Sequence, residues 1–119
     1  MKTLKIIVIL QALIIVIISC NNTTNKQNVV QVNKTSSFKV WGNCDMCKET
    51  IENSLKVNGI AKANWNEDTK LIEVGFDSTL ISLDNIQKNI ATVGYDNEAY
   101  KGSEEAYNNL QECCKYDRK

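Results

Sequence analysis

The stretch Ser36–Cys47, which reads SSFKVWGNCDMC, decides the fold because a strand pattern gives way to a helix pattern within it. Phe38 and Val40 are two residues apart, and this period is typical of a half-buried strand. Over residues 45–56 the apolar side chains instead recur every three or four positions, which places them on one face of a helix. The stretch therefore predicts a strand, a short loop and the start of a helix.

The same two patterns recur downstream. Two alternating runs within residues 61–76 flank a polar turn, which predicts a β-hairpin. A second helix is expected over residues 83–93 with Ser82 as its N-cap, and residues 95–100 are expected to form a last short strand. The order β-α-β-β-α-β predicts an α+β, ferredoxin-like sandwich, with two helices on one face of a four-stranded antiparallel sheet.

The first 19 residues are typical of a secretory signal peptide. A basic start precedes the apolar run Ile6–Ile18, which is 13 residues long, whereas a helix needs about 20 to cross a bilayer. The run ends at Ser19-Cys20, which resembles a bacterial lipobox. That resemblance implies cleavage before Cys20 and a lipid anchor on this cysteine. An uncleaved N-terminal anchor is the alternative.

Residues 20–36 are rich in Asn, Thr, Gln and Lys and are expected to form a flexible tether after the lipidated cysteine. We therefore expect a lipoprotein of the cell envelope, attached to a membrane through Cys20 and facing the periplasm. The folded domain is expected over residues 37–101. Residues 102–119 are expected to add a short C-terminal helix and a Cys-Cys tail.

The composition excludes several classes of function. Without residues 1–19 the chain has 12 basic and 14 acidic residues, which gives no basic face for nucleic acid. The sequence contains no histidine, so the commonest general base, the Cys–His nucleophile pair and His-containing zinc sites are all excluded. We expect neither an enzyme nor a nucleic-acid-binding protein.

Cys44 and Cys47 are the leading candidates for metal ligands. Close pairs of cysteines favour metal binding or redox chemistry over a disulfide framework. Thiolates select soft ions, above all Cu(I), and the N-terminus of a helix stabilises their negative charge. Met46 offers a thioether that also suits Cu(I), although core or half-exposed packing beside the helix is the alternative for this side chain.

Cys113 and Cys114 form the second close pair, and three roles remain open for them. The tail could fold back and add thiolates near Cys44 and Cys47, which would create a site for Zn(II), Cd(II) or clustered Cu(I). The pair could instead pass electrons or metal to the first pair. A structural disulfide is the third alternative.

Residues 37–101 resemble the heavy-metal-associated domain, the family of copper chaperones, of modules in P-type copper ATPases and of a periplasmic mercury carrier. The features that carry the resemblance are the CxxC at the strand–helix junction, Gly59-Ile60, and Val93-Gly94-Tyr95. The sequences Gly-Asn-Cys-x-Met-Cys and Cys-Cys-x-Tyr are similar to those of envelope lipoproteins from Bacteroidetes-type bacteria. The usual loop of the family has a methionine before the first cysteine, which is absent here.

The resemblance implies that the protein carries or sequesters a metal ion in the envelope. Cu(I) is the expected ion, with Zn(II), Cd(II) and Hg(II) as others, and a metal-donor or metal-acceptor protein is the expected partner. The resemblance also places Tyr95 near the metal loop, where ordinary core packing is the alternative.

Two other classes remain as alternatives. A thiol–disulfide oxidoreductase would use the CxxC pair, but thioredoxin-like sites carry a proline loop and this sequence has no proline. A purely structural lipoprotein would keep its cysteines in disulfides.

Overall fold

The computed structural model describes residues 29–118. The expected signal peptide and the lipid-bearing Cys20 lie outside these residues, so their assignment stays a prediction. Within the described part of the chain, none of the helices has both the length and the apolar character needed to span a bilayer.

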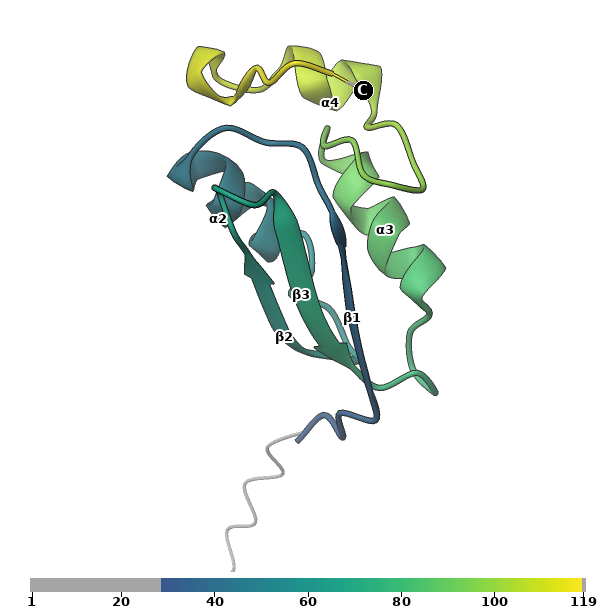
Figure 1. Cartoon of the computed structure of the whole chain (residues 1–119). Coiled ribbons are helices and arrows are strands. Elements are labelled where there is room, and N and C mark those ends of the chain that lie inside the picture. Colours follow the sequence, from purple (N-terminus) through teal and green to yellow (C-terminus); the bar gives the residue numbers. More distant parts are fainter. Residues whose placement is uncertain (1–28, 119) are drawn as a thin grey trace, which may run out of the picture.

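The core of the domain is a three-stranded antiparallel sheet. Strands β1 (Lys34–Lys39), β2 (Ile60–Trp65) and β3 (Leu71–Phe76) are arranged in the order β1-β3-β2 (Figure 1). Ile72 on the central strand pairs with both Phe38 and Trp65, so these three side chains lie on the same face of the sheet, and all three are buried. The alternation that predicted the strands therefore distinguishes the core face from the solvent face.

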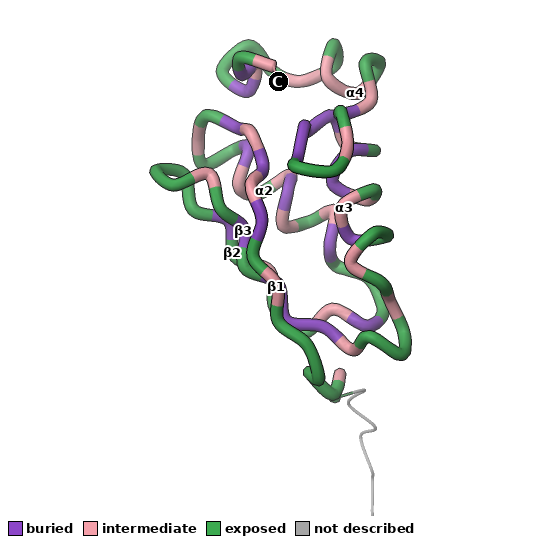
Figure 2. Tube along the Cα trace, turned by 45° about the vertical axis from the view of Figure 1, so that its right-hand side comes forward, coloured by how far each residue is buried: buried purple, intermediate pink, exposed green. Residues whose placement is uncertain are grey.

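Helices α2 (Asp45–Asn53) and α3 (Leu83–Thr92) complete the core. Ile51 from α2 and Ile86 from α3 are fully buried in the same cluster as the inward side chains of the strands. Figure 2 shows the buried stretches on β3, α2 and α3. The predicted cap of α3 is confirmed, because the Ser82 hydroxyl accepts a hydrogen bond from the backbone N–H of Asn85 at 3.1 Å.

The prediction of a fourth strand over residues 95–100 is wrong. This segment makes a single antiparallel bridge, between Val40 and Asn97. The side-chain oxygen of Asn97 accepts hydrogen bonds from the backbone N–H groups of Ala99 and Tyr100, which curls the chain into a turn. Such local side-chain bonds compete with a strand ladder. The α+β class is confirmed, but the sheet has three strands.

Strand β1 begins earlier than expected. Lys34 pairs with Phe76 and Ser36 pairs with Val74, so residues 34–36 of the expected tether belong to the sheet. Their polar character concealed this from the sequence, since Lys34 and Thr35 point to solvent and give no apolar alternation. The central strand β3 supplies the backbone partners.

The C-terminal extension lies across the end of the molecule at which α2 begins (Figure 1). It consists of α4 (Glu104–Asn108) and a 3₁₀ helix (Glu112–Cys114). Ser103 caps α4 by accepting a hydrogen bond from the backbone N–H of Ala106. The expected C-terminal helix is therefore present, and the chain beyond it returns to the domain.

Tyr116 fastens this extension to the domain. Its buried ring stacks on Tyr95 with 5.6 Å between the ring centroids and meets Tyr107 edge-on at 5.2 Å. Its hydroxyl group donates to the carbonyl of Gly94 and accepts from the backbone N–H of Asp96, both at 2.7 Å. The last residues of the tail are thereby fixed against the end of α3.

We predict that Gly94→Ala destabilises the protein by about 1–3 kcal/mol, because Gly94 has a φ of +97° that disfavours any side chain. A Cβ at this position would also lie 2.7 Å from the backbone nitrogen of Tyr107 in α4. Urea unfolding would measure the loss. Gly75→Ala is the matched control, since its Cβ would meet no atom closer than 3.4 Å, and equal losses in the two variants would contradict the prediction.

Candidate metal centre

Three sulfur atoms converge at the N-terminal end of α2. The Sγ atom of Cys44 lies 3.6 Å from that of Cys47 and 3.9 Å from that of Cys114. All three sulfur atoms lie within 4.8 Å of one another. The structure thus joins one cysteine of the tail to both cysteines of the CxxC motif, although 70 positions separate Cys44 from Cys114.

Cys44 occupies the N-cap position of α2. Its backbone is extended, with a φ of −149° and a ψ of 176°, and its carbonyl accepts the hydrogen bond from the N–H of Lys48. Hydrogen bonding from the backbone N–H of Cys47 holds the pKa of the Cys44 thiol below its ordinary value. The free N–H groups and the dipole of a helix N-terminus favour a thiolate in this position.

Cys47 is buried on the inner side of the loop. The backbone N–H of Asn43 donates a hydrogen bond to its Sγ atom at 3.3 Å. Gly42 leaves room for this arrangement, because a Cβ there would lie 3.1 Å from the Trp65 ring and 3.2 Å from the Cβ of Cys47. The short loop between β1 and α2 therefore packs on Trp65. The indole N–H in turn donates to the carbonyl of Val40 at 3.0 Å.

Cys113 and Cys114 are neighbours in the chain but occupy different environments. Cys114 is buried, and burial followed by interaction with the Cys47 thiol raises its pKa to about 12. Cys113 is exposed, and its Sγ atom lies 3.6 Å from the Sδ atom of Met46. The Met46 side chain is 41% exposed, which fits half-exposed packing beside the helix rather than burial in the core.

Tyr95 closes the inner side of the cluster. Its side chain is completely buried, and its hydroxyl group faces the thiols of Cys47 and Cys114. Burial, and then the Cys47 thiol, raises the pKa of this hydroxyl well above its usual range. No partner among the described residues meets the geometry of a hydrogen bond to it. Tyr95 is thus both a core residue and a neighbour of the sulfur atoms.

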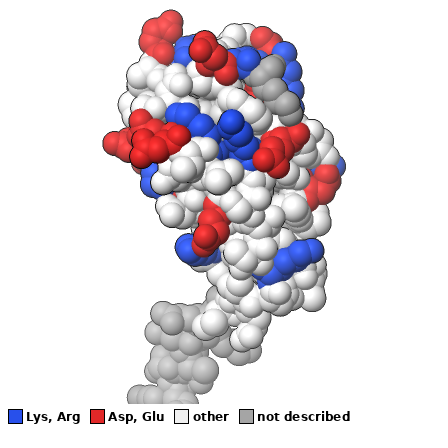
Figure 3. Space-filling view, viewed as in Figure 1, with Lys and Arg blue, Asp and Glu red and all other residues white. Residues whose placement is uncertain are grey.

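The charged side chains near the cluster are engaged elsewhere. The ammonium group of Lys48 bonds to the Glu52 carboxylate at 2.7 Å and to the carbonyl of Trp65, so it turns away from Asp45. The ammonium group of Lys115 donates to the carbonyl of Tyr107 at 2.8 Å. On the face drawn in Figure 3, acidic and basic side chains are interspersed.

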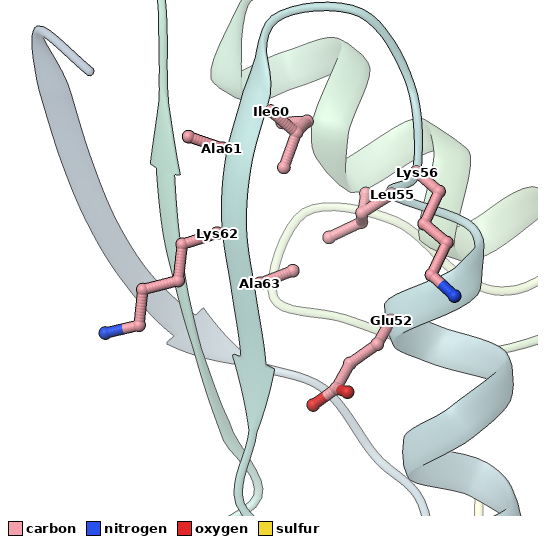
Figure 4. A pocket seen from close by; sticks show the side chains of 7 residues that line it. All are labelled: Glu52, Leu55, Lys56, Ile60, Ala61, Lys62 and Ala63. Carbon is pink, nitrogen blue, oxygen red and sulfur yellow. The ribbon is translucent and has the colours of Figure 1, made fainter. Parts of the chain in front are cut away.

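A shallow pocket lies elsewhere, between α2 and β2 (Figure 4). The side chains that line it belong to both elements and the chain between them, and none is a cysteine: Glu52, Leu55, Lys56, Ile60, Ala61, Lys62 and Ala63. Its lining is aliphatic with a few charged groups and offers no soft ligand. Among the described residues, the group of three mutually close thiols lies at the start of α2 and not at this pocket.

Solved structures with a similar fold include a metallochaperone and copper-binding proteins. The CopZ metallochaperone is 24% identical to this protein, and the match covers 54% of this chain and 98% of that chain with a TM-score of 0.52. A copper-binding domain from HMA7, a P-type ATPase, is 27% identical, and the match covers 54% of this chain and 89% of that chain with a TM-score of 0.52. A protein of Bacillus anthracis str. Ames that is assigned to copper-ion binding is 30% identical over 55% of this chain and 94% of that chain, with a TM-score of 0.52. The domain shares their fold.

These neighbours are a metallochaperone, a copper-binding domain of an ATPase and a protein assigned to copper-ion binding, which agrees with the expectation of a metal-binding chain rather than a catalytic one. No family model matches the sequence, and no curated protein matches it. The similar structures cover little more than half of this chain, so the rest of it has no counterpart in them.

The sequence named every sulfur atom that the structure brings together, but it did not separate Cys114 from Cys113. It also gave no role to the Tyr116 side chain that holds the tail. Tyr116 had one available signal, its place two residues after the cysteine pair. No signal in the sequence pointed to the ion pair between Arg118 and the buried Asp96, since 22 positions separate these two residues.

We predict that iodoacetamide distinguishes the cysteines of the metal-free protein. Because the pKa of Cys44 is lowered and that of Cys114 is raised to about 12, Cys44 should ionise and react at lower pH than an ordinary thiol. At about pH 8.5, where half of an ordinary thiol is ionised, Cys114 should stay unmodified. Peptide mass spectrometry over a pH series would measure both. Both cysteines should react alike in urea, and equal profiles in the folded protein would contradict the assignment.

Proposed function

We propose that the protein binds a soft metal ion through Cys44 and Cys47 and carries or sequesters it in the cell envelope. The observation that supports this best is the pair of thiols 3.6 Å apart at the N-terminus of α2. Thiolates select soft ions, and Cu(I) suits them best among those available to cells. Zn(II), Cd(II) and Hg(II) are weaker candidates for the same site. Two of the similar solved structures, a copper-binding domain and a protein assigned to copper-ion binding, support the choice of copper.

The position of the site suits exchange of the ion with another protein. Cys44 is partly exposed, and α2, which it caps, begins at one end of the molecule (Figure 1). A thiol of a donor or acceptor protein can approach the ion and become a ligand before Cys44 leaves. This exchange requires no general base, which agrees with the absence of histidine.

We further propose that a lipid on Cys20 holds the domain at a membrane surface, facing the periplasm. The apolar run that ends at Ser19-Cys20 supports this proposal. A tether between the lipid and β1 would let the domain turn toward a partner protein.

We predict that the double variant Cys44→Ser/Cys47→Ser weakens Cu(I) binding by at least about 100-fold, which corresponds to about 2.7 kcal/mol. A hydroxyl group is a hard donor and does not replace a thiolate on a soft ion. Anaerobic competition of the purified, reduced protein against a Cu(I) chelator would measure the loss. The exposed Cys113→Ser is the control and should bind as tightly as the unaltered protein. Tight binding by the double variant would disprove the proposed site.

We predict that Cys20→Ser abolishes attachment of a fatty acid. Metabolic labelling with an alkyne fatty acid, followed by cell fractionation, would test this, and the altered chain should lose both the label and its association with membranes. Cys113→Ser is again the matched control, and labelled Cys20→Ser protein would exclude the proposed anchor.

A further inference from the structure

We propose that the C-terminal tail supplies the third ligand of the metal site. The ion is held by the thiolates of Cys44, Cys47 and Cys114, in a site that only the folded tail completes. This inference rests on the proposed function, since it takes the CxxC pair as the first two ligands. It adds a ligand from outside the part of the sequence that resembles the heavy-metal-associated domain.

The distances between the sulfur atoms favour three ligands over two. With metal–sulfur bonds of ~2.3 Å, a linear two-coordinate ion would hold its sulfur atoms ~4.6 Å apart, whereas a trigonal ion would hold each pair ~4.0 Å apart. The observed separations from Cys44 are 3.6 Å to Cys47 and 3.9 Å to Cys114. The pair closest in sequence is thus too close for a linear ion, and the pair from distant segments already has the trigonal spacing.

The place of Cys114 is built by contacts that do not involve its sulfur atom. The hydroxyl of Tyr116 bonds to the backbone on both sides of Tyr95, as described above. Arg118 adds an ion pair at 2.7 Å with the completely buried carboxylate of Asp96. The fold therefore holds the tail against the loop before any ion is bound, and little ordering entropy remains to be lost on binding.

The geometry selects Cys114 and not its neighbour. Cys114 is buried in the cluster, whereas Cys113 is exposed and contacts Met46 on the outer side. Cys113 lies 3.9 Å from Cys114 but does not belong to the group of three mutually close sulfur atoms. These two adjacent residues thus form a natural pair of test and control.

Tyr95 provides a second, independent indication of a charged ligand in the cluster. Its hydroxyl is completely buried, faces Cys47 and Cys114, and has no hydrogen-bond partner among the described residues. A buried donor without a partner is costly. When a metal ion displaces the thiol protons, the thiolates become strong acceptors, and the Tyr95 hydroxyl gains a charge-assisted hydrogen bond. Tyr95 is therefore a positioning residue for the bound form.

The third thiolate also defines the class of ion. Binding releases three thiol protons to solvent, so Cu(I) leaves a centre of charge −2 and a divalent ion leaves one of charge −1. Cu(I), Cd(II) and Hg(II) are soft enough for three sulfur atoms. Structural Zn(II) sites take four ligands, and this cluster offers three. The site is therefore suited to soft ions of either charge and leaves one side open to a partner's thiol.

X-ray absorption spectroscopy of the Cu(I)-loaded full chain would count the sulfur ligands. The sample is reduced with a phosphine, so that no small thiol can bind the ion. We expect three sulfur neighbours in the unaltered protein and in Cys113→Ser, and two in Cys114→Ser. In chelator competition, Cys114→Ser should bind Cu(I) at least about tenfold more weakly than the unaltered protein. Loss of a residue that only bonds to a ligand already weakens metal binding by about this factor, and loss of a ligand should cost no less. Cys113→Ser should stay within about twofold of the unaltered protein.

The outcomes separate this inference from the proposed function. Two sulfur neighbours in the unaltered protein, with equal affinity in Cys114→Ser, would overturn the third ligand and leave the CxxC carrier intact. Failure of the unaltered protein to bind Cu(I) would overturn both. A loss of one sulfur in Cys113→Ser instead of Cys114→Ser would overturn the choice of residue.

A second variant covers the case in which Cys114→Ser fails to fold. Tyr95→Phe keeps all the thiols and removes the hydroxyl that faces them. We expect it to retain three sulfur neighbours and to bind Cu(I) about tenfold more weakly, with a far-ultraviolet circular dichroism spectrum that matches the unaltered protein. Unchanged affinity in Tyr95→Phe would exclude its role, and the sulfur count of Cys113→Ser would still decide the role of Cys114.

Discussion

The hydroxyl group of Tyr116 makes the two hydrogen bonds on which the arrangement of the cysteines depends. It bonds to the carbonyl of Gly94 and to the N–H of Asp96, and so it ties the tail to the segment that carries Tyr95. The stacked Tyr95 and Tyr116 rings then set the distance between the tail and the core. Cys114, two residues before Tyr116, is carried to the start of α2 as a consequence.

The loop that holds the other two thiols depends on a different contact. Gly42 approaches the Trp65 ring so closely that a Cβ would have to displace it. Trp65 is buried in β2 and is fixed by the bond from its indole to Val40. Trp65 thus belongs to the core and also supports the loop between β1 and α2. Packing and site geometry cannot be separated at this residue.

The site combines one thiol that favours ionisation with one that resists it. Backbone N–H groups at the helix start lower the pKa of Cys44, whereas burial raises the pKa of Cys114. An incoming ion would therefore meet the more reactive Cys44 first, and it would have to displace the proton of Cys114 to gain its third ligand. This order follows from the position of each thiol relative to α2 and to solvent.

Local periodicity and capping residues were enough to predict the two helices, the hairpin, the Ser82 cap and the CxxC at a strand–helix junction. These features depend on side chains a few positions apart, which the sequence displays directly. The tertiary structure alone decided that residues 95–100 form a single bridge and a turn in place of a fourth strand, and that Cys114 rather than Cys113 meets Cys44. The turn depends on hydrogen bonds from backbone N–H groups to the Asn97 side chain, which a pattern of apolar residues does not display. The choice of cysteine depends on contacts between residues tens of positions apart, and such contacts are set by how the packed elements meet rather than by any local pattern.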